Sequence, residues 1–114
     1  MVAGPRMTLQ TQLVLRAFLH EPAQERYGLR LCEETGLPSG TIYPIVARLE
    51  QAGWVESRWE DPREHITEGR PRRRYYRLTD DGAEQARVAL ARVRRPGTLF
   101  GFDAAVTRPG IAGA

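Results

Sequence analysis

The 114-residue sequence contains no lysine, a single cysteine and no long hydrophobic run. Because Cys32 has no partner for an intramolecular disulfide, we expect a reducing, cytoplasmic setting and interpret this residue as a small buried hydrophobe. The longest apolar runs span three or four residues, and the first twenty residues lack the basic start and apolar block of a secretion signal. The sequence therefore predicts neither a membrane-spanning segment nor secretion.

The residue patterns that accompany catalysis and metal binding are also missing. No serine or cysteine nucleophile is accompanied by a plausible base, and no glycine-rich phosphate loop occurs. His20 and His65 are too far apart in the sequence for metal-ligand spacing, and neither has a cysteine nearby. We therefore predict a protein that is not an enzyme and that needs no metal and no cofactor.

Positive charge is present, and it is concentrated in one part of the chain. All 17 basic residues are arginine, and they exceed the 14 acidic residues to give a net charge of +3. Residues 58–79 alone contain seven arginines and four acidic residues, whereas residues 1–57 are nearly balanced. A basic patch on an otherwise balanced protein is typical of a polyanion partner, and guanidinium groups suit bidentate phosphate contacts.

Hydrophobic spacing predicts two helices in the first third of the chain. The first covers residues 8–20 and ends before a proline, and the second covers residues 27–35, with Leu29 and Cys32 turned inward and Leu31 as a further candidate for the inner face. We expect Gly36 to end the second helix in the left-handed conformation, and the glycine-containing turn that follows leads into a third helix. Short helices joined in this way predict a helix-turn-helix unit.

The third helix, predicted over residues 39–52, has two distinct faces. Its apolar residues follow the spacing of one buried stripe, formed by Ile42, Ile45, Val46 and Leu49. We expect Ser39 to cap the start of this helix. The remaining face carries the side chains that are free to meet a partner, namely Thr41, Tyr43, Pro44 and Arg48.

A two-stranded ribbon is predicted after the third helix. Residues 54–59 and 72–78 are expected to be its strands, with Trp54 in the core beneath them. Residues 60–71 combine two prolines and a glycine with many charges, which predicts a long mobile loop. The return strand starts with three arginines that either contact phosphates or protect a solvated strand edge, namely Arg72, Arg73 and Arg74.

A last helix is predicted over residues 80–95. Its apolar stripe is narrow, as is typical of paired helices, and consists of Ala83, Ala86, Leu90 and Val93. Because a helix of about fifteen residues is marginal alone, we expect it to pack against a second copy of the chain or against the first helix of either subunit. Residues 1–7 and 96–114 are expected to be a leader and a tail without fixed structure.

Two motifs together resemble one protein family. The run GTIYP with the following RLE and glycine, and the later run from Arg70 to Thr79 ending in YRLT before Gly82, strongly resemble the PadR family of bacterial winged-helix transcriptional regulators. The resemblance covers roughly residues 9–95. It implies a mostly α fold with a β-hairpin, made of a winged helix-turn-helix over residues 8–79 and a dimerisation helix over residues 80–95.

The same resemblance implies a homodimeric transcriptional repressor that binds a palindromic operator. Its recognition helix would enter the major groove, and its wing, residues 58–78, would follow the phosphates. The expected DNA-binding residues are Ser39, Thr41, Tyr43, Pro44, Arg48, Arg70, Arg72, Arg73 and Arg74, and the expected dimerisation residues are Ala83, Ala86, Leu90 and Val93.

Two questions stay open at this level. The family resemblance allows a small apolar or aromatic effector, of which the sequence gives no identity. A different class of function, a winged-helix module that binds an acidic protein, would also use the wing arginines. The polar face of the third helix favours DNA, because a protein-interaction module more often exposes a large apolar patch.

Overall fold

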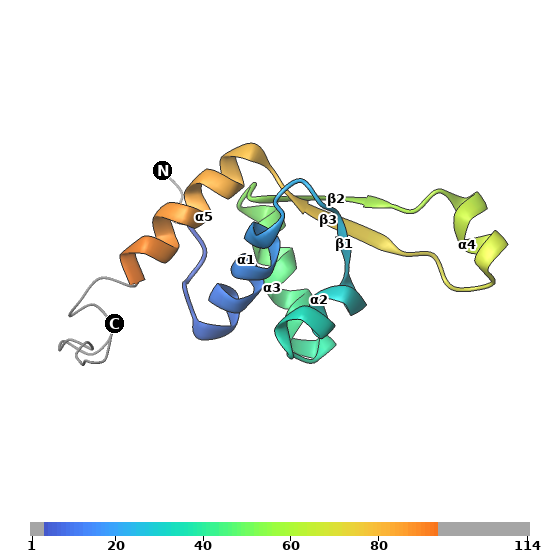
Figure 1. The fold of residues 1–114 in the computed structure, drawn as a ribbon, viewed down its shortest axis with the longest axis horizontal. Coiled ribbons are helices and arrows are strands. Elements are labelled where there is room, and N and C mark those ends of the chain that lie inside the picture. The colour runs from blue at the N-terminus through green and yellow to red at the C-terminus, as the bar shows by residue number, and fades with distance from the viewer. Residues whose placement is uncertain (1–3, 94–114) are drawn as a thin grey trace.

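The computed structural model describes residues 4–93, which form a helical body with a long hairpin projecting from it (Figure 1). The elements in chain order are α1 (Leu9–His20), β1 (Arg26–Tyr27), α2 (Gly28–Thr35), α3 (Ser39–Gln51), β2 (Val55–Trp59), α4 (Pro62–Glu68), β3 (Arg74–Leu78) and α5 (Asp80–Val93). The predicted tail, residues 96–114, lies outside the described residues. No helix within residues 4–93 is long and apolar enough to cross a membrane.

Helices α1, α2 and α3 surround a common apolar core. The predicted stripe of α3 is confirmed, because Ile42, Ile45, Val46 and Leu49 are all buried. Leu31 of α2 is also buried, whereas Leu29 is 62% exposed, so the expectation that Leu29 turns inward was wrong. Helix α2 has only eight residues, and so short a helix offers room for few core positions.

The turn between α2 and α3 differs from the prediction at its second half. Gly36 ends α2 in the left-handed conformation, as expected. The N-cap of α3 is Pro38, whose extended backbone lets its carbonyl oxygen accept from the N–H groups of Thr41 and Ile42. Ser39 is therefore the first helical residue, and the prediction that its side chain caps α3 was wrong.

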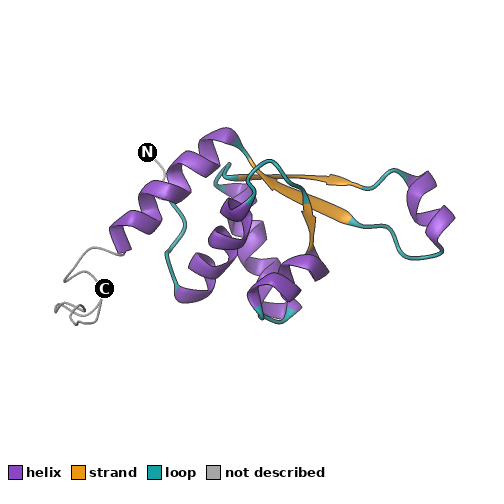
Figure 2. Cartoon of the chain, in the orientation of Figure 1, coloured by secondary structure: helices purple, strands orange, loops and turns teal. Residues whose placement is uncertain are grey.

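The predicted hairpin is the larger part of a three-stranded antiparallel sheet in the order β1-β3-β2. Strands β2 and β3 pair from Val55 opposite Leu78 to Trp59 opposite Arg74. Strand β1 adds two residues to the free side of β3 (Figure 2). Such a short strand has no periodicity of its own, which is why the sequence did not reveal it.

The tip of the hairpin holds a helix where the sequence predicted a mobile loop, so that prediction was wrong. Helix α4 begins after Asp61, whose carboxylate accepts from the N–H of Arg63 at 2.9 Å. Pro62 stands in its first turn, and Gly69 closes it in the left-handed conformation. These are ordinary helix start and stop residues, but the segment lacks an apolar stripe that would mark it as a helix.

Helix α5 is attached to the body by a capped and closely packed first turn. The hydroxyl of Thr79 accepts from the N–H of Gly82 at 2.8 Å. Gly82 passes directly over Trp54, since a Cβ at this position would lie 2.0 Å from the Trp54 carbonyl oxygen. Trp54 is buried, as predicted. The direction in which α5 leaves the body is therefore set by this contact.

Candidate nucleic-acid interface

The face of α3 that points away from the core carries the residues predicted from the sequence. Tyr43, Pro44 and Arg48 are exposed on it, and Thr41 is half-buried at its edge. Within residues 4–93, no carboxylate lies within ion-pairing distance of Arg48. The structure thus gathers these side chains on one surface, and a free guanidinium group stands among them.

Tyr43 is held in place by the start of α2. A Cβ at Gly28 would lie 2.2 Å from the Tyr43 hydroxyl oxygen, so the tyrosine ring occupies the space that any other residue at position 28 would fill. The ring is nevertheless 48% exposed. This contact orients a large side chain on the surface of α3 before any partner arrives.

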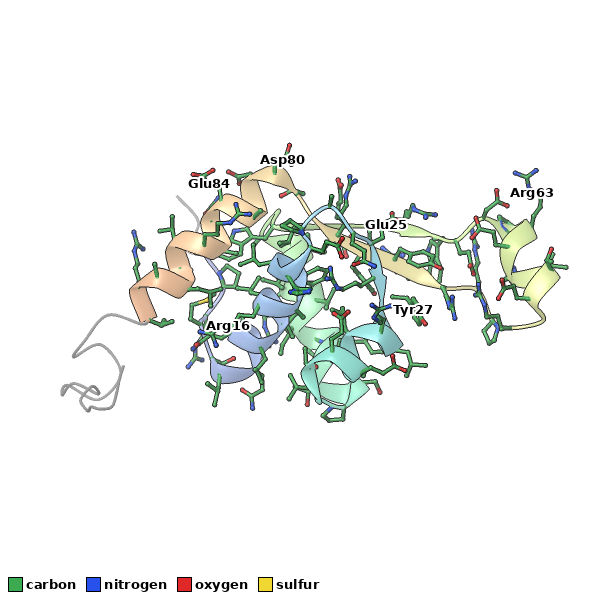
Figure 3. The ribbon with its side chains drawn as sticks, viewed as in Figure 1. Arg16, Glu25, Tyr27, Arg63, Asp80 and Glu84 are labelled. Carbon is green, nitrogen blue, oxygen red and sulfur yellow. The ribbon has the colours of Figure 1, made fainter. Side chains whose placement is uncertain are left out.

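The two faces of the hairpin have different chemistry. One face continues from the core outward through Val55, Ser57 and Trp59, opposite Leu78, Tyr76 and Arg74. The other face carries charged residues that pair with acids. Glu25 lies beside the sheet (Figure 3), where it accepts two hydrogen bonds of 2.7 Å from Arg58. Arg77 pairs with Glu56 on the same face. The Arg58 guanidinium also lowers the pKa of the Glu25 carboxyl.

A small polar network joins α3 to the first of these faces. The hydroxyl of Ser57 donates to Glu50 of α3 at 2.6 Å, and Arg74 donates to Ser57 at 2.8 Å. The Arg74 guanidinium also lies 3.7 Å from the Glu50 carboxylate. Glu50 therefore ties the end of α3 to the wing. Sequence reasoning missed this role, because the partners lie on different elements.

The three arginines at the start of β3 divide between the two faces. The guanidinium groups of Arg72 and Arg74 lie 5.3 and 5.1 Å from the ring centroid of Trp59. Arg73 instead lies over Tyr27, at 3.9 Å from its ring centroid, on the other side of the sheet. Successive side chains of an extended chain point to opposite faces, and this places Arg73 on the face opposite Arg72 and Arg74.

Arg70, also predicted to bind DNA, is engaged by a carboxylate at the wing tip. Its two terminal nitrogens each donate to one oxygen of Glu60 at 2.7 Å, and the Glu60 side chain is fully buried. These hydrogen bonds lower the pKa of Glu60 to about 2, so the pair stays ionised throughout the neutral range. Arg70 thereby fixes the base of α4, and a DNA contact by this residue stays a prediction.

The wing arginines that form no ion pair lie just before β3. Exposed Arg63 is paired with Asp61 at 2.9 Å, and Arg58 and Arg77 have the acidic partners described above. Within the described part of the chain, no carboxylate lies within 4.0 Å of Arg72 or Arg73. These two residues are the ones that can neutralise phosphates without first breaking an ion pair.

The residues predicted for dimerisation lie mainly inside the chain's own core. Ala83, Ala86 and Leu90 are buried against it, and Val93 is half-buried at the end of α5. On the other side of the helix, Val88 is 47% exposed. A second copy would therefore meet α5 on the side of Val88 first. Dimerisation through the predicted stripe stays a prediction.

A comparison with protein-family models finds one match in this chain. The model of the transcriptional regulator PadR-like family matches residues 17–88. This range includes α3, the whole wing and most of α5. A comparison with curated proteins finds no match.

Solved structures provide three informative likenesses. A PadR family transcriptional regulator from Eggerthella lenta DSM 2243 is 25% identical, with a TM-score of 0.59 over 75% of this chain and 76% of that one. The overoxidized regulator AbfR bound to DNA is 26% identical, with a TM-score of 0.57 over 75% of this chain. The regulator PcaV from Streptomyces coelicolor, in complex with its natural ligand, is 31% identical, with a TM-score of 0.57 over 77% of this chain. This chain covers only 56% of AbfR and 58% of PcaV.

Proposed function

Because the chain belongs to the transcriptional regulator PadR-like family, we propose that it is a sequence-specific DNA-binding regulator that represses transcription from a palindromic operator. The observation that carries this proposal is the arrangement of α3 and the wing. The free arginine of α3, Arg48, and the unpaired wing arginine on the face towards α3, Arg72, belong to elements that Glu50 ties together. Two elements that each present a free arginine and are tied together can engage one duplex.

In the proposed complex, α3 lies in the major groove and the wing lies against the neighbouring backbone. An α-helix fits the major groove of B-DNA, and arginine is the side chain that most often contacts its base edges. The structural likeness to AbfR bound to DNA supports this assignment. Thr41, Tyr43, Pro44 and Arg48 are the proposed groove contacts, and Ser39 is proposed as a phosphate contact at the start of the helix.

The first test asks whether Arg48 reads sequence. The wild-type protein is expected to shift DNA from upstream of its own gene in a gel and to protect a short segment in a footprint. If Arg48 contacts a guanine, Arg48→Ala should cost about 1–3 kcal/mol on that segment and much less on random DNA. Equal losses on both duplexes would make Arg48 a phosphate contact. Failure of the wild type to bind any duplex would reject the proposed function.

We further propose that the regulator acts as a two-fold dimer. Two copies of α3 about one helical turn of DNA apart, roughly 34–36 Å, would match the symmetry of a palindromic site. Helix α5 is the proposed contact, since its outward side exposes Val88 while its inward side is already packed. A short helix of this kind gains little stability from its sequence alone and benefits from packing on both sides.

Two substitutions on α5 test this arrangement. Val88→Asp should place a charge in the dimer contact and shift the protein towards monomer while leaving its fold intact, as measured by sedimentation and circular dichroism. Leu90→Asp should unfold the chain instead, because Leu90 is 7% exposed within its own core. A folded monomer from Leu90→Asp, with Val88→Asp still dimeric, would place the contact on the predicted stripe. A wild type that stays monomeric at micromolar concentration, yet binds its operator tightly, would exclude the dimer.

We also propose a place for an effector. A cavity of about 430 Å³ lies between the segment before α1 and the side of α5, and its lining includes Met7, Trp54, Val88 and Arg92. Its volume is within the range of small-molecule sites, and its lining is partly apolar, as in most ligand pockets. A ligand there would touch the same side of α5 that the proposed dimer uses. The likeness to PcaV, which binds a natural ligand, supports this proposal.

A further inference from the structure

Helix α4 at the tip of the wing has no part in the proposed function. Residues 60–70 around it contain four carboxylates and two arginines, which gives a net charge of −2 with histidine neutral. Glu64 is exposed, and within residues 4–93 no basic side chain lies within 4.0 Å of its carboxylate. Glu68, one turn further along α4, is 61% exposed. Like charges repel, so such a tip favours a positively charged partner over phosphates.

The complementary charge lies at the other end of the molecule. A cavity of about 400 Å³, which we call the α1–α5 cavity, opens between these two helices. Its lining combines two arginines and a histidine, Arg16, Arg87 and His20, with apolar side chains, and it contains no acid. Arg87 is exposed, and in the described part of the chain neither arginine has a carboxylate within 4.0 Å. The cavity therefore presents uncompensated positive charge.

Arg16 indicates which kind of group this cavity accepts. Its side chain leaves α1 beside α5 (Figure 3). The Nε atom of Arg16 is buried, and among the described residues it has no hydrogen-bond acceptor. Buried donors in folded proteins nearly always have an acceptor, and carboxylates are the partners that guanidinium groups bind most strongly. An arginine left in this state at the wall of a cavity favours an acidic occupant.

We propose that α4 of one chain docks at the α1–α5 cavity of a second copy, with Glu64 towards Arg16 and Arg87. Each surface carries the charge that the other lacks. The two surfaces lie at opposite ends of the molecule, so a single chain cannot join its own tip to its own cavity (Figure 1). The contact is therefore heterologous and can connect copies in a row. It leaves Val88 accessible, because Val88 does not line this cavity.

Charge reversal tests the contact, because its two surfaces belong to different chains. A contact this small is weak, so sedimentation equilibrium is measured in low salt at about 100 µM protein. Glu64→Arg brings an arginine against Arg87 of the next copy, and Arg87→Glu brings two acids together, so each variant alone should self-associate roughly tenfold more weakly than the wild type. An equal mixture of the two should recover the wild-type association, because each tip then meets a cavity of opposite charge. A mixture that associates no better than either variant overturns the proposal.

Glu33→Arg is the matched control, since it changes the net charge by the same amount as Glu64→Arg. Glu33 is exposed on α2, and within residues 4–93 it has no ion-pair partner. This variant should self-associate as the wild type does. Raising the salt from about 50 to about 500 mM should dissociate the contact made by Glu64, because exposed charges are screened, and should affect an apolar contact at Val88 much less. An equal loss in Glu33→Arg, or a wild type whose association is insensitive to salt, would contradict the proposal.

Cross-linking locates the contact on the two surfaces. All chains carry Cys32→Ala, which removes the only native thiol. One chain carries Thr67→Cys, on the side of α4 that includes Glu64, and the other carries Ala91→Cys in the lining of the cavity. A short bifunctional thiol reagent should join these two chains, but it should not join Thr67→Cys to Leu29→Cys, although Leu29 is 62% exposed on α2. Equal cross-linking to both positions would exclude the cavity as the docking site. No DNA is present in these experiments, so their failure leaves the proposed function standing.

Discussion

Replacing Glu34 with alanine is expected to lower the free energy of unfolding by about 3–5 kcal/mol. The carboxylate of Glu34 accepts from Nε of Arg26 at 2.8 Å, and Arg26 is only 1% exposed. Removing one partner of a buried ion pair leaves the other charge without compensation in a place that water does not reach. We expect the lower end of the range, because Glu34 itself is 24% exposed and two carbonyl oxygens, of Glu21 and Gln24, still accept from Arg26.

A matched control is available on the same carboxylate. Arg30 also binds Glu34 at 2.8 Å, but it is 44% exposed and forms an ordinary i,i+4 pair on the surface of α2. Arg30→Ala should therefore cost about 0.5 kcal/mol or less. Urea denaturation of both variants measures the two effects. Equal losses would show that burial of Arg26 contributes nothing to the strength of the pair.

The Arg26–Glu34 pair also shows where prediction from the sequence succeeds and where it ends. The stripe of α3 was predictable, because one helix repeats its inward positions at fixed spacing. The glycine that ends α2 was predictable for a similarly local reason. Arg26 and Glu34 belong to β1 and α2, and nothing in their spacing tells which acid will meet which arginine. Only the fold brings Arg26 to Glu34.

The wing was predicted as an element but not in its detail. Its strands follow from β-branched and aromatic residues between turn signals, and its positive charge follows from composition. Helix α4 could not be inferred by periodicity, since seven residues without an apolar stripe resemble a charged loop. Glu60 looked like one of several acids near the tip, yet among them it alone is fully buried, and it accepts two hydrogen bonds from Arg70. Ion pairs that only the fold reveals decide which arginines lack an acidic partner and can therefore contact DNA.

Because the wing arginines differ in their contacts, replacing them should have unequal effects on the affinity for DNA. Replacing Arg72, Arg73 and Arg74 together with alanine should weaken binding to cognate and random duplexes alike. A protein that neutralises Z phosphates shows a log–log salt slope of about −0.9Z, so each lost contact should reduce the magnitude of the slope by about 0.9, and three contacts set an upper limit of about 2.7. A duplex that receives α3 would meet the wing face that carries Arg72 and Arg74, so we expect the larger share from these two residues, with Arg74 exchanging its 3.7 Å contact with Glu50 for a phosphate. The double variant Arg72→Ala with Arg74→Ala is therefore expected to reduce the magnitude of the log–log salt slope by about 1.8.

Two single variants complete the experiment. Arg73→Ala should change the slope little, because Arg73 lies over Tyr27 on the opposite face of the sheet. Arg77→Ala should also leave it nearly unchanged, since Arg77 is already paired with Glu56 and its charge is compensated. Titrations between 50 and 200 mM salt span the range in which phosphate contacts dominate affinity. An unchanged slope in the triple variant would remove these arginines from the DNA interface. A loss carried by Arg73 alone would show that the duplex meets the opposite face of the wing.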